Sequence, residues 1–277
     1  MKKSKNIHIW YSVILGFIMM FIFTGCSENG GNRKDKLTVG MECAYAPFNW
    51  IQPTSKGNAV EIAGGWYACG YDVYIASKLA EIMGKELEIV KIDWDGLLPA
   101  LTSGKIDAII AAMSATEDRR KAIDFTDKYY TSNVVLVTKK GSKYENAKSI
   151  EDFSGAKVTA QLGTIHYKLI DQMPGALKQV PTEDLSSTIS SLNAGKIDCY
   201  VSEKATAMST VHTNPNLKYI EFEEGKGFKF SKDEIEVRIG VKKGSKLKDE
   251  INEALKLIDE ETRNKLMENA VEQSCIT

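Results

Sequence analysis

The sequence lacks an excess of charge of either sign, because 36 lysines and arginines stand against 37 acidic residues in 277 positions. No block of basic residues interrupts the body of the chain, which argues against a nucleic-acid partner. The five cysteines include no CxxC pair, so neither a zinc ribbon nor a thioredoxin-type site is indicated. With 43% hydrophobic and 26% charged residues, the composition excludes a disordered chain and a polytopic membrane protein.

The start of the chain differs from the rest. Three lysines among the first five residues precede the apolar run Ile9–Phe23, which is shorter than the ~20 residues that span a membrane. This pattern predicts a secretory signal peptide over residues 1–25. Phe23-Thr24-Gly25-Cys26 resembles a bacterial lipoprotein box, so Cys26 is expected to carry lipid, palmitate included; a plain signal anchor is the alternative. Residues 26–36 are predicted to be a flexible tether that holds the protein outside the cytoplasmic membrane.

One pattern occurs twice in the chain. Leu101-Thr-Ser-Gly-Lys-Ile-Asp107 and Leu192-Asn-Ala-Gly-Lys-Ile-Asp198 share the form L-x-x-G-K-I-D, and an apolar run follows each. Each copy is typical of a helix end, a glycine in left-handed conformation and a short buried strand. The first helix is expected to begin at Asp95 and the second near Asp184. The echo therefore predicts two similar lobes.

The remaining elements alternate between strand and helix, which favours open, mostly parallel sheets with helices on both faces. In such sheets a ligand binds beyond the carboxyl ends of the strands, so the cleft between two lobes is the natural site. Expected strands are 37–42, 87–92, 107–112, 134–138, 157–160, 198–202 and 236–241; expected helices are 71–83, 204–211 and a long terminal one from Ser245.

Charged groups of both signs follow these strands. Arg119 stands one turn into a short helix capped by Thr116, where its guanidinium can bind a carboxylate; pairing with Glu117 or Asp118 is the alternative. The turn before Thr164 and Ile165 presents free amides to an anion, or is an ordinary turn. Glu203 follows the corresponding strand of the second lobe and can hold an ammonium group, or cap a helix.

Further candidates lie near the first strand end. Glu42 is a second spare carboxylate, or an exposed acid beside the cleft. Tyr45 and Trp94 are aromatics that can sandwich a ligand, although each alone is more often a core residue. Together with Arg119, the amide turn and Glu203, these residues suit a free α-amino acid.

Six motifs of the chain occur together: Tyr45-Ala-Pro-Phe48, Gly70-Tyr-Asp-Val73, Trp94-Asp-Gly-Leu-Leu-Pro-Ala-Leu101, Ser103-Gly-Lys-Ile-Asp107, Met113-Ser-Ala-Thr-Glu-Asp-Arg119 and Ile123-Asp-Phe-Thr-Asp-Lys-Tyr-Tyr130. By these motifs the chain resembles the extracellular amino-acid-binding proteins of ABC importers, family 3. The resemblance implies a class II periplasmic-binding-protein fold of two lobes joined by two crossover hinge strands near Thr131–Val134 and Ser231–Glu236. Lobe 1 would comprise residues 37–131 and 234–277, and lobe 2 residues 134–231.

The resemblance also implies roles for single residues. Arg119 would bind the ligand carboxylate with Ser114 as its companion, and the backbone amides of Thr164 and Ile165 would bind it from lobe 2. The Ala112 carbonyl would accept from the α-amino group. Glu203 stands where the family usually has an Asp that binds the α-amino group. The substitution keeps the negative charge but lengthens the side chain.

The side-chain pocket is expected to be acidic and aromatic. Tyr45 and Trp94 would clamp the ligand side chain, Glu42 would meet a basic group, and Gln161 would line the same cleft. Arginine or lysine is therefore the favoured ligand, with glutamine and other polar amino acids open. The implied partner is an ABC permease that a monomeric, closed form docks on, with no cofactor and no metal.

Two rival functions and two smaller features remain. A dehydratase-like enzyme could use Glu42 and Glu203 as acid and base, but the three histidines are isolated; a surface adhesin or sensory module is the second rival. Outside the membrane Cys43 and Cys69 could form a disulfide, with free buried thiols as the alternative. The insert 49–67 is expected to be a surface loop.

Overall fold

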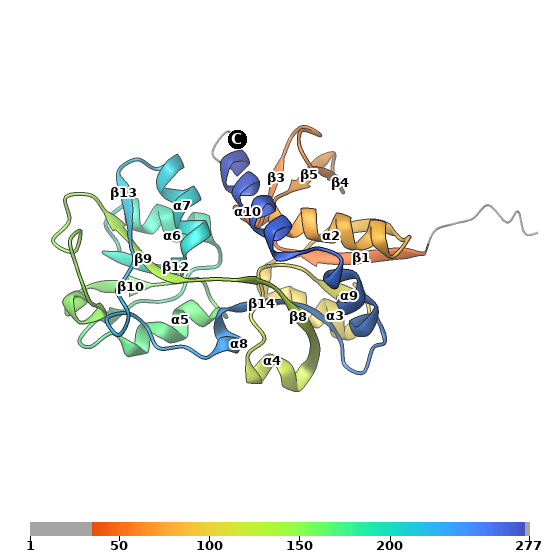
Figure 1. The fold of residues 1–277 in the computed structure, drawn as a ribbon. Helices are drawn as coiled ribbons and strands as arrows, with labels where there is room; N and C mark the ends of the chain where they lie inside the picture. The colour runs from red at the N-terminus through yellow and green to blue at the C-terminus, as the bar shows by residue number, and fades with distance from the viewer. Residues whose placement is uncertain (1–34, 275–277) are drawn as a thin grey trace, which may run out of the picture. The chain divides into compact units, whose positions relative to one another are not determined.

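The computed structural model describes residues 35–274, which form one unit of two lobes (Figure 1). The predicted signal peptide, the predicted lipidation site Cys26, nearly all of the predicted tether and Cys275 lie outside the described residues. Within residues 35–274, no helix is both long and apolar enough to cross a membrane.

The first lobe is built around a five-stranded sheet in the order β6-β1-β7-β14-β8. β1 runs parallel to β6 and β7, whereas β14 is antiparallel to β7 and β8. Side chains of β1 such as Val39 and Met41 are fully buried. The strands are β1 (Lys36–Met41), β6 (Glu86–Lys91), β7 (Ala108–Ile109), β8 (Ile123–Thr131) and β14 (Glu236–Lys242).

The second lobe is built around a sheet in the order β11-β10-β12-β9-β13. β10 is parallel to β11 and β12, and β9 is antiparallel to β12 and β13. The strands are β9 (Val134–Lys139), β10 (Lys157–Thr159), β11 (Leu177–Lys178), β12 (Cys199–Glu203) and β13 (Leu217–Ile220). Both sheets thus contain the expected parallel core with antiparallel strands added at one side.

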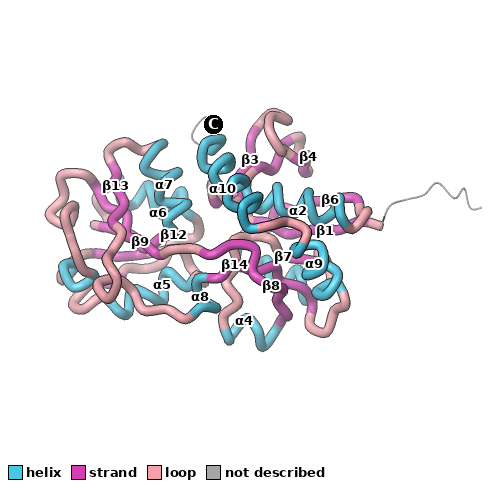
Figure 2. Tube along the Cα trace, in the orientation of Figure 1, coloured by secondary structure: helices cyan, strands magenta, loops and turns pink. Residues whose placement is uncertain are grey.

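Helices cover both faces of each sheet (Figure 2). α2 (Tyr71–Ile82), α9 (Leu247–Lys256) and α10 (Glu260–Ser274) pack on one face of the first sheet, and α3 (Leu97–Ser103) packs on the other. α5 (Ile165–Leu169) lies against one face of the second sheet, and α6 (Leu185–Asn193) and α7 (Lys204–Thr213) lie against the other. Shorter elements are α4 (Glu117–Ala122), α8 (Lys232–Ile235) and the 3₁₀ turns η1 (Trp94–Gly96), η2 (Ile150–Phe153) and η3 (Ile170–Gln172).

Three local predictions were wrong. Asp95 does not cap a helix, because it lies inside η1 and α3 begins only at Leu97. The terminal helix is two helices, α9 and α10, separated by residues 257–259. The insert 49–67 is no loop: β3 (Asn49–Gln52), β4 (Val60–Ile62) and β5 (Trp66–Cys69) join β2 (Ala44–Tyr45) in a four-stranded antiparallel sheet.

The sequence echo corresponds to a structural one. Gly104 and Gly195 both adopt left-handed φ angles, 80° and 71°, at the ends of α3 and α6. The Asp107 carboxylate accepts from Thr38 N at 2.8 Å, and the Asp198 carboxylate accepts from Lys157 N at 2.8 Å. Each aspartate thereby fixes the strand that follows it beside a parallel neighbour, β7 beside β1 and β12 beside β10. The two helix–strand units are equivalent, as the repeated motif predicts.

Two crossings connect the lobes side by side. The chain leaves the first sheet at the end of β8 and enters the second at Val134, and it returns through α8 into β14. Ser132 N donates to Ile235 O at 2.8 Å, and Glu236 pairs with Thr131. This is the two-crossover arrangement that a hinge between lobes requires.

Cys43 and Cys69 are free and buried, which corrects the expected disulfide. Cys43 immediately precedes β2, Cys69 ends β5, and β3 lies between these two strands. Strands separated by a third lie about 9–10 Å apart, whereas bridged Cα atoms lie within roughly 7 Å of each other.

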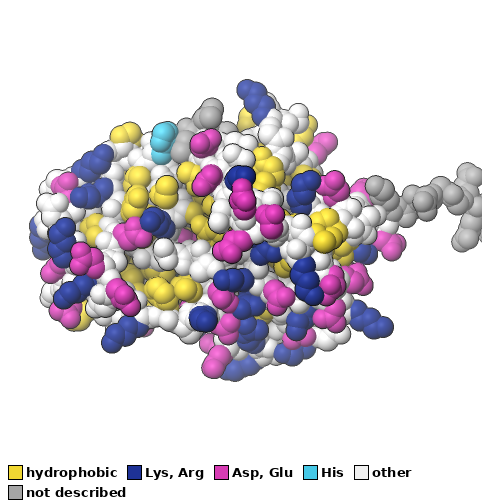
Figure 3. All heavy atoms as spheres, viewed as in Figure 1, with side chains coloured by type: hydrophobic (Ala, Val, Ile, Leu, Met, Phe, Trp, Pro, Cys, Tyr) yellow, Lys and Arg dark blue, Asp and Glu magenta, His cyan; other side chains and the backbone are white. Residues whose placement is uncertain are grey.

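Charges of both signs are interspersed on the face shown in Figure 3. Exposed pairs such as Lys36–Glu88 and Lys265–Glu261 are of the solvent-screened kind, which contribute little stability. The fold therefore depends on its buried layers rather than on its surface pairs.

Gly70, which precedes α2, is a position where stability can be tested. Its φ is 120°, and a Cβ atom there would lie 2.4 Å from the Phe48 carbonyl oxygen. We predict that Gly70→Ala lowers the free energy of unfolding by about 2–4 kcal/mol. Gly84→Ala is the control, since φ is +66° but nothing lies within 4 Å of its Cβ position; a loss of about 1 kcal/mol is expected. Equal losses in urea titrations would contradict this explanation.

Candidate functional site

One pocket lies where strand ends of the two lobes meet, and its empty space is about 360 Å³. All ten residues predicted to bind the ligand line it, and Ala111 and His166 join them. The lining residues are Glu42, Tyr45, Trp94, Ala111, Ala112, Ser114, Arg119, Gln161, Thr164, Ile165, His166 and Glu203.

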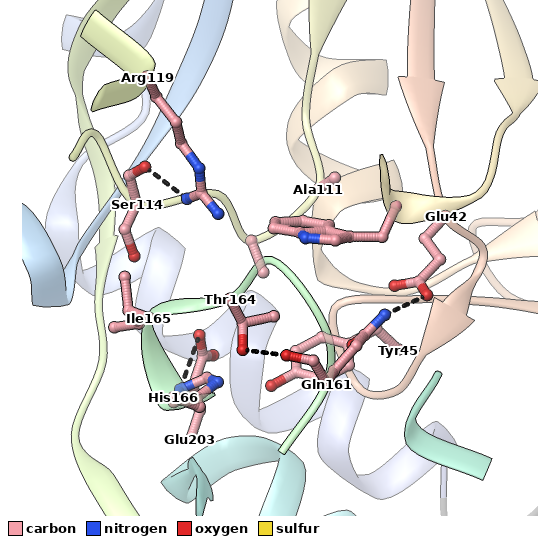
Figure 4. Close-up of a pocket in the computed structure, with 12 residues that line it drawn as sticks. Glu42, Tyr45, Ala111, Ser114, Arg119, Gln161, Thr164, Ile165, His166 and Glu203 are labelled. Atoms are coloured by element: carbon pink, nitrogen blue, oxygen red, sulfur yellow. Dashed lines mark hydrogen bonds and ion pairs between the residues drawn. The ribbon is translucent and has the colours of Figure 1, made fainter. Parts of the chain in front are cut away.

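The fold explains why residues so far apart in sequence meet here. Glu42 directly follows β1, and Ala111 and Ala112 follow β7. Gln161 comes after β10, and Glu203 ends β12. β1 and β7 are parallel neighbours in the first sheet, and β10 and β12 are parallel neighbours in the second. The carboxyl ends of each pair therefore lie at the same edge of their own sheet. Figure 4 shows these side chains converging from both lobes.

Arg119 enters the pocket from α4, whose first turn is capped by the Thr116 hydroxyl. Its guanidinium donates to Ser114 O at 2.8 Å and, across the cleft, to Gly163 O at 3.0 Å. It also lies 5.1 Å from the Trp94 ring centroid, which suits a cation–π contact. Among the described residues, no carboxylate lies within ion-pair distance of Arg119. Its positive charge is therefore available to a ligand.

Burial lowers the pKa of the Arg119 guanidinium to about 10. The group still carries its charge at neutral pH. A carboxylate that met it in this partly water-free setting would form hydrogen bonds roughly twice as strong as neutral ones.

Glu203 is the opposite charge on the second lobe. The residue is only 4% exposed, and Oε2 has no hydrogen-bond partner within the described chain. Burial raises the pKa of Glu203 to about 8, and the nearby charge of Asp72 adds to the rise. An ammonium group placed against this carboxylate would favour its ionised form.

His166 is the functional candidate that sequence reasoning missed. Its Nε2 lies 4.0 Å from Glu203 Oε1, and no other group within residues 35–274 hydrogen-bonds to it (Figure 4). Burial lowers the pKa of His166 to about 4, and the Arg119 charge contributes. The imidazole is thus neutral at pH 7. The available signal was its position in the first turn of the helix that opens at Thr164, directly beside the predicted site.

Glu42 and Gln161 form a hydrogen bond between the two lobes, at the end of the pocket away from Glu203. Gln161 Nε2 donates to Glu42 Oε1 at 2.6 Å and to Glu183 O at 3.0 Å. Glu42 is 6% exposed, so it is not the exposed acid of the alternative interpretation. Burial raises the pKa of Glu42 to about 7, with the Gln161 hydrogen bond acting in the opposite direction.

The aromatic pair flanks these charges. Trp94 lies in η1 and Tyr45 in β2, where the Tyr45 ring stacks on Phe48 with centroids 6.0 Å apart. Both rings are half-buried and line the pocket. Both contribute flat apolar surface to the pocket that Glu42 also lines, and the Arg119 guanidinium lies over the Trp94 ring.

The hydroxyl groups of Ser114 and Thr164 already form hydrogen bonds within the protein. The Ser114 hydroxyl donates to Glu234 O at 2.9 Å, so it contributes an acceptor rather than a free donor. Thr164 caps α5 by accepting from Tyr167 N, and its own hydroxyl donates to Gln161 O at 2.7 Å. These bonds fix the turn over 161–165. Thr164 N also donates to Gln161 O, at a long 3.4 Å, so the turn offers a ligand backbone amides rather than the hydroxyl, with Thr164 N only weakly engaged.

The site combines opposite charges without catalytic machinery. Arg119 and Glu203 come from different lobes and share one pocket. Within the described part of the chain, no cluster of three or more histidine, cysteine or acidic side chains is arranged to hold a metal ion. The chemistry on offer is recognition of a small molecule that carries both charges.

The fold and this pocket define a two-lobed solute-binding protein. Residues 37–272 match the bacterial extracellular solute-binding proteins, family 3, and the chain belongs to that family. It is therefore a binding protein rather than an enzyme, and the dehydratase alternative is set aside. Membership also agrees with the class II fold predicted from sequence.

Several relatives are similar over most of their length. A protein of Campylobacter jejuni named "Probable histidine-binding protein" is 34% identical, over 75% of this chain and 76% of its own. The arginine-binding extracellular protein ArtP of Bacillus subtilis is 28% identical, over 91% and 92%. An ancestral arginine-binding protein bound to arginine is 32% identical with a TM-score of 0.71, over 86% of this chain and 98% of its own.

Arg119 provides the first test of the site. We predict that Arg119→Ala raises the Kd for an amino acid at least 100-fold, because a charge-assisted bidentate contact is lost. Isothermal titration measures this loss, and circular dichroism should show a folded chain.

Arg120→Ala is the matched control. Arg120 lies on the same helix but pairs with Asp233 at 3.0 Å and does not line the pocket. Its Kd should equal that of the wild type. Wild-type affinity in Arg119→Ala would remove this residue from the site.

Proposed function

We propose that this chain binds a free basic amino acid, arginine above all, outside the cytoplasmic membrane and delivers it to an ABC permease. The observation that carries the proposal is the meeting of three buried or half-buried charges in one pocket. Arg119 is positive, whereas Glu203 and Glu42 are acids at separate ends of the same space. A basic amino acid carries one negative and two positive groups, which is the complementary set.

The α-carboxylate belongs to Arg119. Its guanidinium can reach a carboxylate that also meets the backbone amides of Thr164 and Ile165 from the other lobe. The α-ammonium belongs to Glu203 and to backbone carbonyls of the Ala111–Ala112 turn. Each α-group is thereby held by both lobes, so the ligand prefers the closed arrangement and can shift the hinge equilibrium toward it.

The side chain belongs to Glu42, Tyr45 and Trp94. Glu42 is buried beside two aromatic faces, which favours a guanidinium or ammonium over a neutral amide. Relatives named for arginine support this assignment. Others are named for histidine or cystine, so the family alone does not decide the ligand.

Magnitudes are consistent with such a ligand. Micromolar affinity needs about −8 kcal/mol. Arginine has about 12 non-hydrogen atoms, so each supplies roughly −0.7 kcal/mol, well inside the ~1.5 kcal/mol ceiling for small ligands. Charge-assisted bonds in a cleft that excludes water can reach this value.

Closure and anchoring complete the proposal. The bonds Arg119–Gly163 and Glu42–Gln161 cross between lobes, so residues of the site also act as the closing contacts. We infer that lobe 1 comprises 37–131 and 234–277, that lobe 2 comprises 134–231, and that the crossings act as the hinge. Lipid on Cys26 would keep the protein, as a monomer, near its permease.

Glu42 decides between basic and neutral ligands. We predict that Glu42→Gln raises the Kd for arginine roughly tenfold or more but changes the Kd for glutamine far less, because only arginine loses a charge partner. Calorimetric titration with both ligands checks this. Glu88→Gln is the control, since Glu88 pairs with Lys36 away from the pocket. Equal losses for both ligands would remove the case for a basic side chain.

Binding should release protons. In the protein without ligand the raised pKa values, about 7 for Glu42 and about 8 for Glu203, keep these carboxyls largely protonated at pH 6. A cation binds the ionised forms and lowers their pKa values, so affinity rises with pH. We predict that the Kd for arginine falls about tenfold or more from pH 6 to pH 8.

Titrations in buffers of different ionisation enthalpy measure the released protons. Neutral His166 contributes none in this range, because its pKa is about 4. Glu203→Gln should flatten the dependence above pH 7. A Kd that is constant between pH 6 and pH 8 would contradict the assignment of both carboxylates.

A further inference from the structure

Two backbone positions at the pocket are unusual. Among the described residues, only Cys43 and Ala112 have positive φ angles without being glycine, at 57° and 51°. Cys43 directly follows Glu42, and Ala112 itself lines the pocket. Left-handed backbone is costly for residues with a side chain. Something in the surrounding structure must therefore hold both turns.

A single buried carboxylate holds them. Asp72 is completely buried in the first turn of α2. Its Oδ2 accepts from Asn49 Nδ2 at 2.7 Å, and Asn49 Oδ1 accepts from Cys43 N at 2.7 Å. Its Oδ1 accepts from Tyr129 OH at 2.7 Å, and that hydroxyl accepts from Ala112 N at 3.1 Å. Both left-handed residues are thus tied to Asp72 through one intermediate each.

These ties fix carbonyl directions as well. The N–H and C=O of a trans peptide point in opposite directions in one plane. When Ala112 N–H is held by Tyr129, the Ala111 carbonyl must point away from the buried network, and the Cys43 bond fixes the Glu42 carbonyl in the same way. Ala111 and Glu42 both line the pocket. The network therefore sets the shape of two strand ends at once.

We propose that Asp72 is a positioning residue of the site, which sets the Ala111–Ala112 turn through Tyr129 and the Glu42–Cys43 turn through Asn49. This inference rests on the proposed function and deepens it. The first arm prepares the carbonyls that meet the α-ammonium of the ligand. The second arm places the Glu42 carboxylate that meets its side chain.

A simple helix-capping role does not account for Asp72. An acid in the first turn of a helix often binds the free amides of that helix. The first amides of α2, Tyr71 N and Asp72 N, donate to the backbone oxygens of Pro47 and Phe48 instead. Both carboxylate oxygens instead contact side chains from other elements, Asn49 in β3 and Tyr129 in β8.

Tyr129→Phe tests the first arm, because it removes only the hydroxyl. The Kd for arginine should rise about tenfold, the scale of one hydrogen bond to a charged site. The Kd for δ-guanidinovalerate, which is arginine without its α-amino group, should hardly change. Tyr71→Phe is the matched control, since Tyr71 OH is equally buried but donates to Tyr129 O. It should leave both constants unchanged.

Asn49→Leu tests the second arm with a side chain of similar size. The Kd for arginine should rise about tenfold while the Kd for glutamine changes less, since only arginine uses Glu42. Ratios of two constants within one folded variant are independent of stability losses, and this second variant serves if Tyr129→Phe does not fold. Unchanged ratios in both variants would overturn the positioning role. A wild type that binds no amino acid would instead overturn the proposed function.

Discussion

The structure depends on two opposite charges that face one buried space from separate lobes. Arg119 donates only to carbonyl oxygens, and Glu203 has an oxygen with no partner within the described chain. Charges withdrawn from water are costly unless they are paired, and burial accordingly raises the pKa of Glu203 to about 8. The protein does not pair the two groups with each other. A molecule that supplies a carboxylate to one and an ammonium to the other therefore gains more from the closed cleft than from the open one, and this difference is what moves a hinge.

The two lobes place these groups at the cleft by equivalent helix–strand units. Each lobe pairs two parallel strands, β1 with β7 and β10 with β12. Asp107 and Asp198 join each pair by the same two bonds, one from the carboxylate and one from the backbone amide. The strand ends then open on the cleft, where Ala111 and Ala112 stand in one lobe and Glu203 in the other. Beneath the first lobe's strand ends, the buried network around Asp72 holds two left-handed turns in place.

Much of the fold and of the candidate site could be predicted from the sequence, because it follows from short sequence patterns. The L-x-x-G-K-I-D motif predicts a helix end, a left-handed glycine and a buried strand, and Gly104 and Gly195 confirm it. The family motifs identified ten residues that the structure brings to one pocket. What could not be predicted depends on tertiary placement. His166 reaches the pocket only because α5 is oriented by the second sheet, and Cys43 and Cys69 are kept apart by an intervening strand that looked like loop. The role of Asp72 could not be predicted either, since nothing near it in sequence identifies Asn49 and Tyr129 as its partners.

The most direct measurement is a thermal-shift comparison of arginine with agmatine, which has the same side chain but no α-carboxylate. Ligand at about 100 times its Kd stabilises a protein by about 2.7 kcal/mol, or roughly 5–10 °C for a chain of this size. We expect arginine to produce such a shift, and amino acids whose side chain is not basic to produce smaller shifts. Agmatine at the same concentration should produce almost no shift. Equal shifts for arginine and agmatine would show that the charge on Arg119 does not select the ligand.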